Sequence, residues 1–130
     1  MLSTGIDLVE TNRIKKSLEN PLFLQRVFGN NEIASLKTKS PKQQILSAAA
    51  WFAAKEAFSK SLGTGIIGFK LSEVEVVHNE FGAPKLIFSD NIKKLVEGKT
   101  FSLSLTHTDN YAAAVVVSMI DEKHCSPVKE

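Results

Sequence analysis

A carboxylate interrupts the apolar face of the longest predicted helix, and it is the clearest chemical signal in this sequence. Counting at 3.6 residues per turn places Glu56 on the same face as Ile45 and Phe52. Burying such a group ionised and unpaired is very unfavourable, so it should become neutral or find a cation. Two interpretations of Glu56 stay open: an internal ion pair with Lys55 or Lys60, or a ligand of a metal ion.

A second carboxylate, Asp7, lies in a segment of another type. Gly5 to Val9 reads as an extended strand that puts Ile6 and Leu8 on one side and Asp7 on the other. A site shared with Glu56 therefore requires a tertiary contact. Two oxygen ligands from separate elements suit Mg²⁺, which takes one or two carboxylates and completes its octahedron with water and substrate phosphate. The alternative is a surface aspartate beside a glycine turn.

Two further features, a histidine and a glycine turn, each allow a structural or a chemical interpretation. His107 shares the strand parity of Phe101 and Leu105, so we expect it to point towards the core or a cleft, either as a satisfied core histidine or as a catalytic group. The turn Gly63-Thr64-Gly65 follows the long helix, where glycine is first of all a C-cap. A glycine-bounded turn also lets the backbone approach a phosphate closely.

The elements that must position these residues follow from periodicity and capping signals. The long helix begins with Ser40 as cap and Pro41 in the first position, and it ends at Gly63. The other expected helices are one capped by Thr11, short helices from Asn20-Pro21 towards Leu36, and a short helix capped by Ser89 and closed by Gly98. The expected strands are a hairpin formed by 74–76 and 84–88, a half-buried strand at 101–107, and a valine-rich strand at 111–120 buried on both faces. This order predicts an α+β fold, in which a mostly antiparallel sheet packs on one long central helix.

Length and charge limit the classes of protein that this chain can represent. Its 130 residues suffice for one domain, which we expect at residues 1–120, followed by a polar tail at 121–130. A hydrophobic fraction of 43% with 23% charged residues is typical of globular proteins. The net charge of +2 is too small to indicate a nucleic-acid-binding protein.

Cysteine usage and hydropathy favour the cytoplasm. With Cys125 as the only cysteine, one chain cannot hold a disulfide framework or a cysteine-based zinc site. No segment approaches the roughly 20 apolar residues that cross a bilayer, and the N-terminus lacks a signal-peptide pattern. We therefore expect a cytoplasmic protein without a membrane partner. Nucleotide phosphate-loop and serine-hydrolase motifs are also absent from the sequence.

Four segments of the sequence, taken together and in order, carry a family resemblance. They are Gly5-Ile6-Asp7-Leu8-Val9-Glu10 with Arg13, then Phe52-Ala53-Ala54-Lys55-Glu56-Ala57-Phe58-Ser59-Lys60, then Leu62-Gly63-Thr64-Gly65, and finally Ser102-Leu103-Ser104-Leu105-Thr106-His107-Thr108 with Tyr111-Ala112. With the Gly82-Ala83-Pro84 turn between them, these segments resemble the holo-acyl-carrier-protein synthases, a family of 4′-phosphopantetheinyl transferases. The resemblance spans nearly the whole chain, up to about Val117. The segment around Lys55 and Glu56 is its most specific part.

The resemblance implies a 4′-phosphopantetheinyl transferase-like fold and a set of site residues. It implies Mg²⁺ held by Asp7 and Glu56, with Lys60 on a coenzyme A phosphate and His107 beside the reacting groups, so that these four residues are catalytic. The residues implied to contact coenzyme A are Lys55, Lys60, Gly63, Thr64, Gly65, His107 and Thr108. Arg13 is implied to contact the acyl carrier protein, and the assembly is implied to be a homotrimer with active sites between subunits.

The implied reaction transfers 4′-phosphopantetheine from coenzyme A to a serine of apo acyl carrier protein. Adenosine 3′,5′-bisphosphate leaves, and the holo carrier supports fatty acid biosynthesis. The serine proton would pass either to His107 or to a water beside Glu56. The sequence departs from the family at Trp51, where members usually carry a basic residue, so a phosphate contact there is in doubt.

Two other functions use the same residues differently. A metal-dependent pyrophosphate hydrolase would use the same ion with water as nucleophile, but the sequence lacks the clustered glutamates expected on one helix for that chemistry. A non-enzymatic module could bind acidic helical partners through Arg13, Lys15 and Lys16, but this leaves Asp7 and Glu56 without a role.

Overall fold

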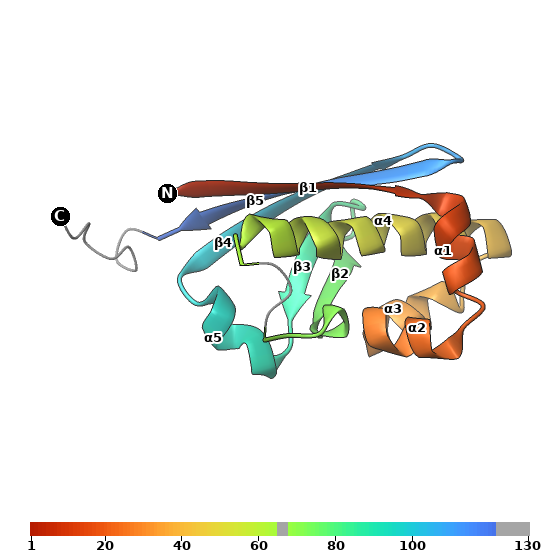
Figure 1. The fold of residues 1–130 in the computed structure, drawn as a ribbon, viewed down its shortest axis with the longest axis horizontal. Helices are drawn as coiled ribbons and strands as arrows, with labels where there is room; N and C mark the ends of the chain where they lie inside the picture. The colour runs from red at the N-terminus through yellow and green to blue at the C-terminus, as the bar shows by residue number, and fades with distance from the viewer. Residues whose placement is uncertain (65–67, 122–130) are drawn as a thin grey trace.

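The computed structural model describes residues 1–64 and 68–121 and shows one long helix between two antiparallel sheets (Figure 1). Helix α4 (Pro41–Ser61) runs along the inner face of a three-stranded sheet. A two-stranded sheet and the shorter helices lie on the other side of α4. The predicted α+β fold, with antiparallel sheet packed on a long central helix, is confirmed.

The three-stranded sheet has the order β1–β5–β4, and both pairings are antiparallel. Its strands are β1 (Leu2–Glu10), β5 (Tyr111–Ile120) and β4 (Lys99–His107). Asp7 of β1 and Leu105 of β4 both pair with Ala114 of the central strand, one from each side. Strand β1 is longer than the predicted 5–9 because it pairs with β5 along its whole length.

Four helices form the N-terminal half, and most of their predicted ends are confirmed. They are α1 (Thr11–Ser17), α2 (Pro21–Val27), α3 (Asn30–Leu36) and α4. The Asn20 side chain accepts a hydrogen bond from Leu22 N at 3.0 Å, and Ser40 Oγ accepts one from Gln43 N at 3.3 Å, so both residues act as caps. Thr11 as a cap is wrong: it is the first helical residue, and its hydroxyl instead donates to the Asp109 carbonyl at 2.7 Å.

The second sheet is the predicted hairpin, β2 (Val74–His78) with β3 (Pro84–Phe88). Short helical turns flank it: η1 (Leu71–Glu73), η2 (Asp90–Ile92) and α5 (Lys93–Val96). Ser89 occupies the predicted N-cap position, but its side chain makes no cap hydrogen bond, and its hydroxyl instead donates to Glu73 Oε2 at 3.3 Å. The Ser89 hydroxyl therefore joins the two ends of the hairpin.

Aromatic packing joins the hairpin and β4 to the C-terminal half of α4. The Phe58 ring lies 5.1 Å from Phe101, 5.4 Å from Phe88 and 5.6 Å from Phe69, measured between centroids. Rings at these distances add about 0.5–1.5 kcal/mol per pair beyond the area they bury. They hold the second sheet against the helix.

The outer face of the three-stranded sheet is apolar and exposed over β1 and β5. The exposed large residues on its strands are Leu2, Ile6, Leu8, Tyr111, Val115 and Met119. Ile6 is 68% exposed and Leu8 65%. The prediction that β5 is buried on both faces is wrong for the single chain, because its residues alternate between the α4 side and this open side. Among the described helices, none combines the length and apolarity that would cross a membrane.

Candidate functional site

Gly5 lets strand β1 lie directly against helix α4. A Cβ atom on Gly5 would come within 1.8 Å of the Ala57 carbonyl oxygen and 2.7 Å of the Ser61 backbone nitrogen. Side chains two residues apart on a strand point to the same face, so Asp7 is directed towards α4 as well. The missing side chain of Gly5 therefore brings Asp7 to the last two turns of the helix.

Lys60 links the strand and the helix by direct contacts. Its ammonium donates to the Ile6 carbonyl oxygen at 2.9 Å and to Asp7 Oδ1 at 3.2 Å. The Asp7 side chain is only 18% exposed, whereas the Lys60 side chain is 56% exposed. The carboxylate is thus sheltered at a fixed place, while the ammonium on its flexible stem can turn to meet an arriving anion.

Glu56 lies close enough to Asp7 for the two charges to interact. Burial raises the pKa of Glu56 above its ordinary value of 4.5, and the Asp7 charge raises this pKa further. The positive charges of Lys60 and Arg13 act in the opposite direction. Two carboxylates that repel each other at one place attract a shared cation.

The structure distinguishes the two interpretations left open for Glu56. Lys60 pairs with Asp7, and Lys55 pairs with Glu32. Within residues 1–64 and 68–121, no hydrogen bond or ion pair ends on the Glu56 carboxylate. The predicted internal ion pair is therefore not formed, and both carboxylate oxygens are available to a ligand.

The pair formed by Asp7 and Glu56 fits a hard divalent cation. Mg²⁺ needs only one or two protein carboxylates when water and a substrate phosphate complete its coordination. In the part of the chain that the structure describes, no group of three or more His, Cys, Asp or Glu residues gathers into a complete protein cage for a metal. The residues present therefore fit an ion that is shared with a phosphate ligand.

Arg13, on α1, lies at the edge of these carboxylates. Its guanidinium carbon is 5.7 Å from the centroid of the Phe52 ring, which is a cation–π distance. Its charge lowers the pKa of Glu56, and the residue itself is exposed. A cation at this place is near the candidate metal site and open to a partner.

His107 and Thr108 lie at the other edge of the sheet. His107 is the last residue of β4 and is exposed, so the alternative of a buried core histidine is wrong. It lines a pocket of about 310 Å³ together with Trp51 and His78. The Thr108 hydroxyl oxygen accepts hydrogen bonds from Asn110 N at 3.2 Å and Tyr111 N at 3.1 Å. Strands β1 and β4 are opposite edges of the sheet, so Asp7 and His107 lie on either side of β5.

Lys55 lies in the interior. Its side chain is fully buried, and its ammonium donates to Glu32 Oε1 at 2.6 Å and to the carbonyl oxygens of Leu71 and Val74. A lysine ammonium has three donors, so all of them are used within the protein. This position does not agree with the predicted contact between Lys55 and coenzyme A.

The glycine turn begins immediately after α4. Gly63 has a φ of 76°, a left-handed conformation that glycine adopts without strain, as predicted for the C-cap. Nothing lies within 4 Å of a Cβ at this position, and Thr64 is exposed, so the backbone here is open to an approaching group. Gly65, predicted to belong to the same site, lies outside the described residues.

The sequence profile of the 4′-phosphopantetheinyl transferase superfamily matches residues 3–116. The chain belongs to this superfamily. The matched range contains every predicted site residue, from Asp7 to Thr108.

Curated relatives within the superfamily share about the same length. The chain is 40% identical over 120 residues to a holo-[acyl-carrier-protein] synthase from Caldanaerobacter subterraneus, covering 88% of this chain and 92% of that protein. It is also 40% identical over 120 residues to the protein of the same description from Treponema denticola, covering 90% of this chain and 97% of that one.

Solved structures of superfamily members have the same fold. A holo-(acyl-carrier-protein) synthase from Bacillus anthracis, in complex with CoA (3′,5′-ADP), has a TM-score of 0.79 and 35% identity, covering 89% of this chain and 94% of that one. The holo-[acyl-carrier-protein] synthase from Helicobacter pylori, in complex with coenzyme A, has a TM-score of 0.76 and 31% identity, covering 89% and 99%.

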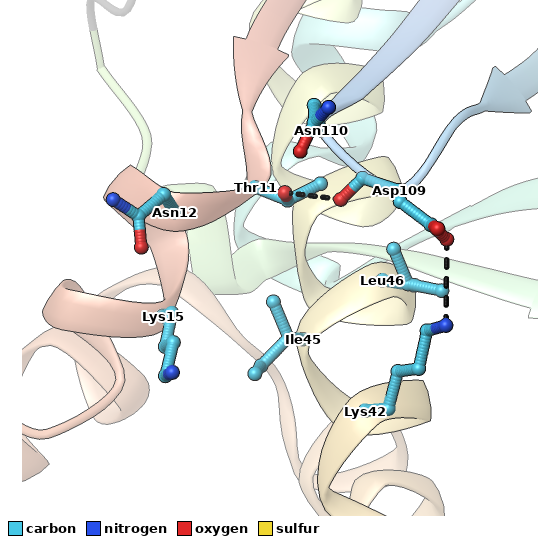
Figure 2. A pocket seen from close by; sticks show the side chains of 8 residues that line it. All are labelled: Thr11, Asn12, Lys15, Lys42, Ile45, Leu46, Asp109 and Asn110. Atoms are coloured by element: carbon cyan, nitrogen blue, oxygen red, sulfur yellow. Dashed lines mark hydrogen bonds and ion pairs between the residues drawn. The ribbon is translucent and has the colours of Figure 1, made fainter.

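This superfamily member has a further pocket, of about 360 Å³, between α1 and the start of α4 (Figure 2). Lys15 of α1 and Lys42 of α4 lie on its two sides, and Lys42 forms an ion pair with Asp109 at 3.5 Å. Both partners of this pair are largely exposed. The pocket lining includes neither Asp7 nor Glu56, so it is separate from the carboxylate site.

Sequence reasoning misses two contributions to these sites. It identifies Gly5 only as part of a motif, although its lack of a side chain brings β1 against α4. The sequence identifies Trp51 only as a departure from the family. In the structure the Trp51 Nε1–H donates to His78 Nε2 at 3.3 Å, and His78 Nδ1 lies 3.1 Å from the Gly82 carbonyl oxygen. Neither the Gly5 approach nor the Trp51 contact has a periodic signal, because each joins distant parts of the chain.

Proposed function

We infer that this protein is an enzyme, a holo-[acyl-carrier-protein] synthase, which transfers 4′-phosphopantetheine from coenzyme A to a serine of an apo acyl carrier protein. The observation that carries this inference is the Asp7 and Glu56 pair, with Lys60 beside it, inside a chain that belongs to the superfamily. Relatives that are 40% identical over most of this chain bear the same description. Solved relatives hold coenzyme A or its nucleotide part.

The carboxylates would hold one Mg²⁺ ion against the pyrophosphate of coenzyme A. Such an ion neutralises charge on the phosphate oxygens as the transferred group passes between two oxygen atoms. Asp7 is sheltered and fixed by Lys60, whereas Glu56 makes no protein contact in the described ranges, so the two residues would supply a rigid and an adjustable ligand. Loss of either charge weakens this arrangement.

Lys60 would stabilise the phosphate charge on the same side of the metal. Its ammonium already lies beside Asp7 and is more than half exposed. Because its stem is flexible, this ammonium could turn from Asp7 and donate to a phosphate oxygen of bound coenzyme A. The backbone at Gly63 and Thr64 would lie near the same phosphates, since these residues closely follow Lys60 in the chain.

The reaction forms a bond between the serine oxygen and the β-phosphorus of coenzyme A. The bridging P–O bond breaks, and its electron pair leaves with adenosine 3′,5′-bisphosphate. The serine proton must pass to a base as the new bond forms. His107, with an exposed imidazole, and a water beside Glu56 are the two candidates that the residues support.

The assembly would be a homotrimer whose active sites lie between subunits. Two observations support this part of the proposal. The outer face of the three-stranded sheet is a large apolar surface, of the kind that marks an interaction site. Asp7 and His107 occupy opposite edges of that sheet, an arrangement that agrees with a site in which the Asp7 edge of one chain meets the His107 edge of another.

The carrier protein would approach over Arg13, which lies between solvent and the carboxylates. Guanidinium groups pair well with the carboxylates of an acidic partner. A cytoplasmic location agrees with the single cysteine and with the coenzyme A substrate.

Mass analysis of an apo carrier protein after incubation with this protein, coenzyme A and Mg²⁺ tests the proposal. We expect the carrier to gain one phosphopantetheine group on a serine. Incubation without the carrier is the control for a pyrophosphate hydrolase, which would release adenosine 3′,5′-bisphosphate from coenzyme A alone. An unmodified carrier under these conditions would contradict the transferase function.

A further inference from the structure

A buried ion pair joins four segments of the chain next to the candidate site. Lys55 of α4 and Glu32 of α3 are both fully buried and meet at 2.6 Å. The Lys55 ammonium also donates to the carbonyl oxygens of Leu71 and Val74. Glu32 Oε2 accepts from Val76 N at 2.9 Å. The pair thus connects two helices to the segment that enters strand β2.

Every hydrogen-bonding group of this pair has a partner. The ammonium uses its three donors on Glu32, Leu71 and Val74. Glu32 Oε1 also accepts from Gly29 N at 3.0 Å. Transferring two charges from water to the interior is costly, and apolar replacements of such pairs are often neutral or stabilising. Stability alone is therefore a weak reason for a charged pair at this place, and its directional contacts need another explanation.

Aromatic side chains also hold helix α4, but the Lys55 pair adds a directional restraint on its rotation about its own axis. It is buried on most of its circumference, and six of its thirteen buried residues are alanines: Ala48, Ala49, Ala50, Ala53, Ala54 and Ala57. Contacts between small apolar side chains are non-directional. The Lys55 ammonium, in contrast, has three partners in set directions, so it resists a rotation that the alanines would tolerate.

The rotation of α4 decides where Glu56 points. Consecutive helical residues lie about 100° apart around the axis. Lys55 therefore faces α3 and β2 while Glu56 faces strand β1, where Asp7 acts on its pKa. Asp7 is held separately, by Lys60 and by the close approach at Gly5. A small rotation of α4 would move Glu56 relative to an Asp7 that stays in place.

We propose that Lys55 is a positioning residue, whose buried ion pair with Glu32 sets the rotation of α4 and so holds the Glu56 carboxylate opposite Asp7. This inference rests on the proposed function of Asp7 and Glu56 as ligands of Mg²⁺. It replaces the expectation that Lys55 contacts coenzyme A. The ammonium reaches no substrate, and its effect passes through the adjacent residue of the helix.

Mg²⁺ binding to the free protein tests the proposal without any turnover. The variant Lys55→Met keeps a long unbranched side chain and removes the ammonium. We expect its dissociation constant for Mg²⁺, measured by calorimetry without coenzyme A, to rise by about tenfold, the usual effect of losing a group that orients a metal ligand. Coenzyme A affinity measured without Mg²⁺ should remain essentially that of the unchanged protein, because Lys55 reaches no substrate.

Lys42→Met is the matched control on the same helix. Lys42 belongs to an exposed ion pair with Asp109, so the same chemical change there should leave Mg²⁺ affinity unaltered. Trp51, the only tryptophan, lies one turn before Lys55 and reports on the helix. Its fluorescence should shift in Lys55→Met, because rotation of α4 disturbs its hydrogen bond to His78, and should not shift in Lys42→Met.

Glu32→Gln decides the question if Lys55→Met does not fold. The glutamine side chain would keep the length and an acceptor for Val76 N but would remove the charge that holds the ammonium. We again expect weaker Mg²⁺ binding. Unchanged Mg²⁺ affinity in a folded variant of either residue would overturn the proposal, as would a selective loss of coenzyme A affinity. If the unchanged protein binds no Mg²⁺ either alone or with coenzyme A present, the proposed function fails instead, so the two failures are distinguishable.

Discussion

At the scale of single residues, the proposed chemistry rests on a carboxylate that the protein leaves unpaired within the described ranges. Asp7 has an ammonium partner in Lys60, whereas Glu56 is partly buried beside another negative charge. A protein that needed only stability would neutralise Glu56 or expose it. The arrangement is understandable if a cation arrives with the substrate.

Glu56→Gln should abolish phosphopantetheine transfer while the fold is retained. The substitution removes the charge that holds the metal but preserves the volume of the side chain. We expect a loss of at least about 100-fold in kcat, since removing one group that stabilises transition-state charge has that effect. Transfer to apo carrier protein would be measured by mass spectrometry, and circular dichroism would check the fold. Full Mg²⁺-dependent activity in this variant would exclude the proposed role.

Mg²⁺ affinity should depend on pH through Glu56. Burial and the Asp7 charge raise the pKa of Glu56 above 4.5. Protons therefore compete with the metal at a higher pH than they would at an ordinary carboxyl group. As pH falls through the raised pKa, the affinity should fall by about tenfold per pH unit, because one proton displaces the metal at this site.

The same raised pKa affects folding of the metal-free protein with the opposite sign. The folded state holds the Glu56 proton more tightly than the unfolded state, so the contribution of this group to stability decreases as pH rises from 4.5 through the raised pKa. Calorimetric titrations with Mg²⁺, at pH values from 4.5 upward, would measure how the Mg²⁺ affinity depends on pH. An affinity for Mg²⁺ that is independent of pH would show that Glu56 is not a ligand.

At the scale of elements, the site depends on how closely β1 approaches α4. The approach at Gly5 brings backbone to backbone, and Lys60 then spans the two elements. On the opposite side, α4 is held by the Lys55 pair. The helix is thus fixed from both sides, close to the two carboxylates.

Gly5→Ala should destabilise the protein and weaken Mg²⁺ binding together. The new methyl group would overlap the Ala57 carbonyl oxygen, so β1 must move away from the helix and take Asp7 with it. We expect a cost of about 1–3 kcal/mol in the free energy of unfolding, typical of overpacking. Thr4→Ala, at the adjacent exposed position, is the control and should change neither quantity by a measurable amount. Urea denaturation and calorimetry measure the two effects, and an unchanged Mg²⁺ affinity in Gly5→Ala would contradict the link.

At the scale of the whole molecule, the single chain leaves an apolar sheet face open and keeps two predicted catalytic residues apart. The open face results from the packing of α4 on one side of the sheet, and the separation results from the strand order, which places β1 and β4 at opposite edges. An assembly that covers the open face and joins one edge to the other edge of a neighbour would account for both.

Mixing two impaired variants should therefore raise activity. Asp7→Asn removes a metal ligand, and His107→Ala removes the imidazole. In a mixed trimer, some interfaces would join an intact Asp7 from one chain to an intact His107 from the next. We expect the mixture, after dissociation and reassembly, to transfer phosphopantetheine faster than either variant alone. Light scattering would establish the trimer, and a mixture no faster than its components would contradict sites shared between chains.

Much of the architecture follows from local pattern in the sequence. The sequence predicts Asn20 and Ser40 as caps because a short polar side chain before proline satisfies free backbone N–H groups, and both side chains do so. The period-2 alternation of 101–107 predicts strand β4, and the hairpin follows from its turn residues. Local predictions fail where a distant group competes for the side chain, as with Thr11, whose hydroxyl donates to the Asp109 carbonyl.

The sequence by itself determined the α+β fold, the strands and helices that carry Asp7 and Glu56, and the resemblance to the superfamily. Only the tertiary structure decided which lysine meets which carboxylate: Lys60 meets Asp7, and Lys55 is buried against Glu32. The reason is physical, because periodicity specifies the face on which a residue lies but not what packs against that face. Ion pairing and the close contact at Gly5 join residues that are far apart in the chain, and such contacts exist only once the chain has folded.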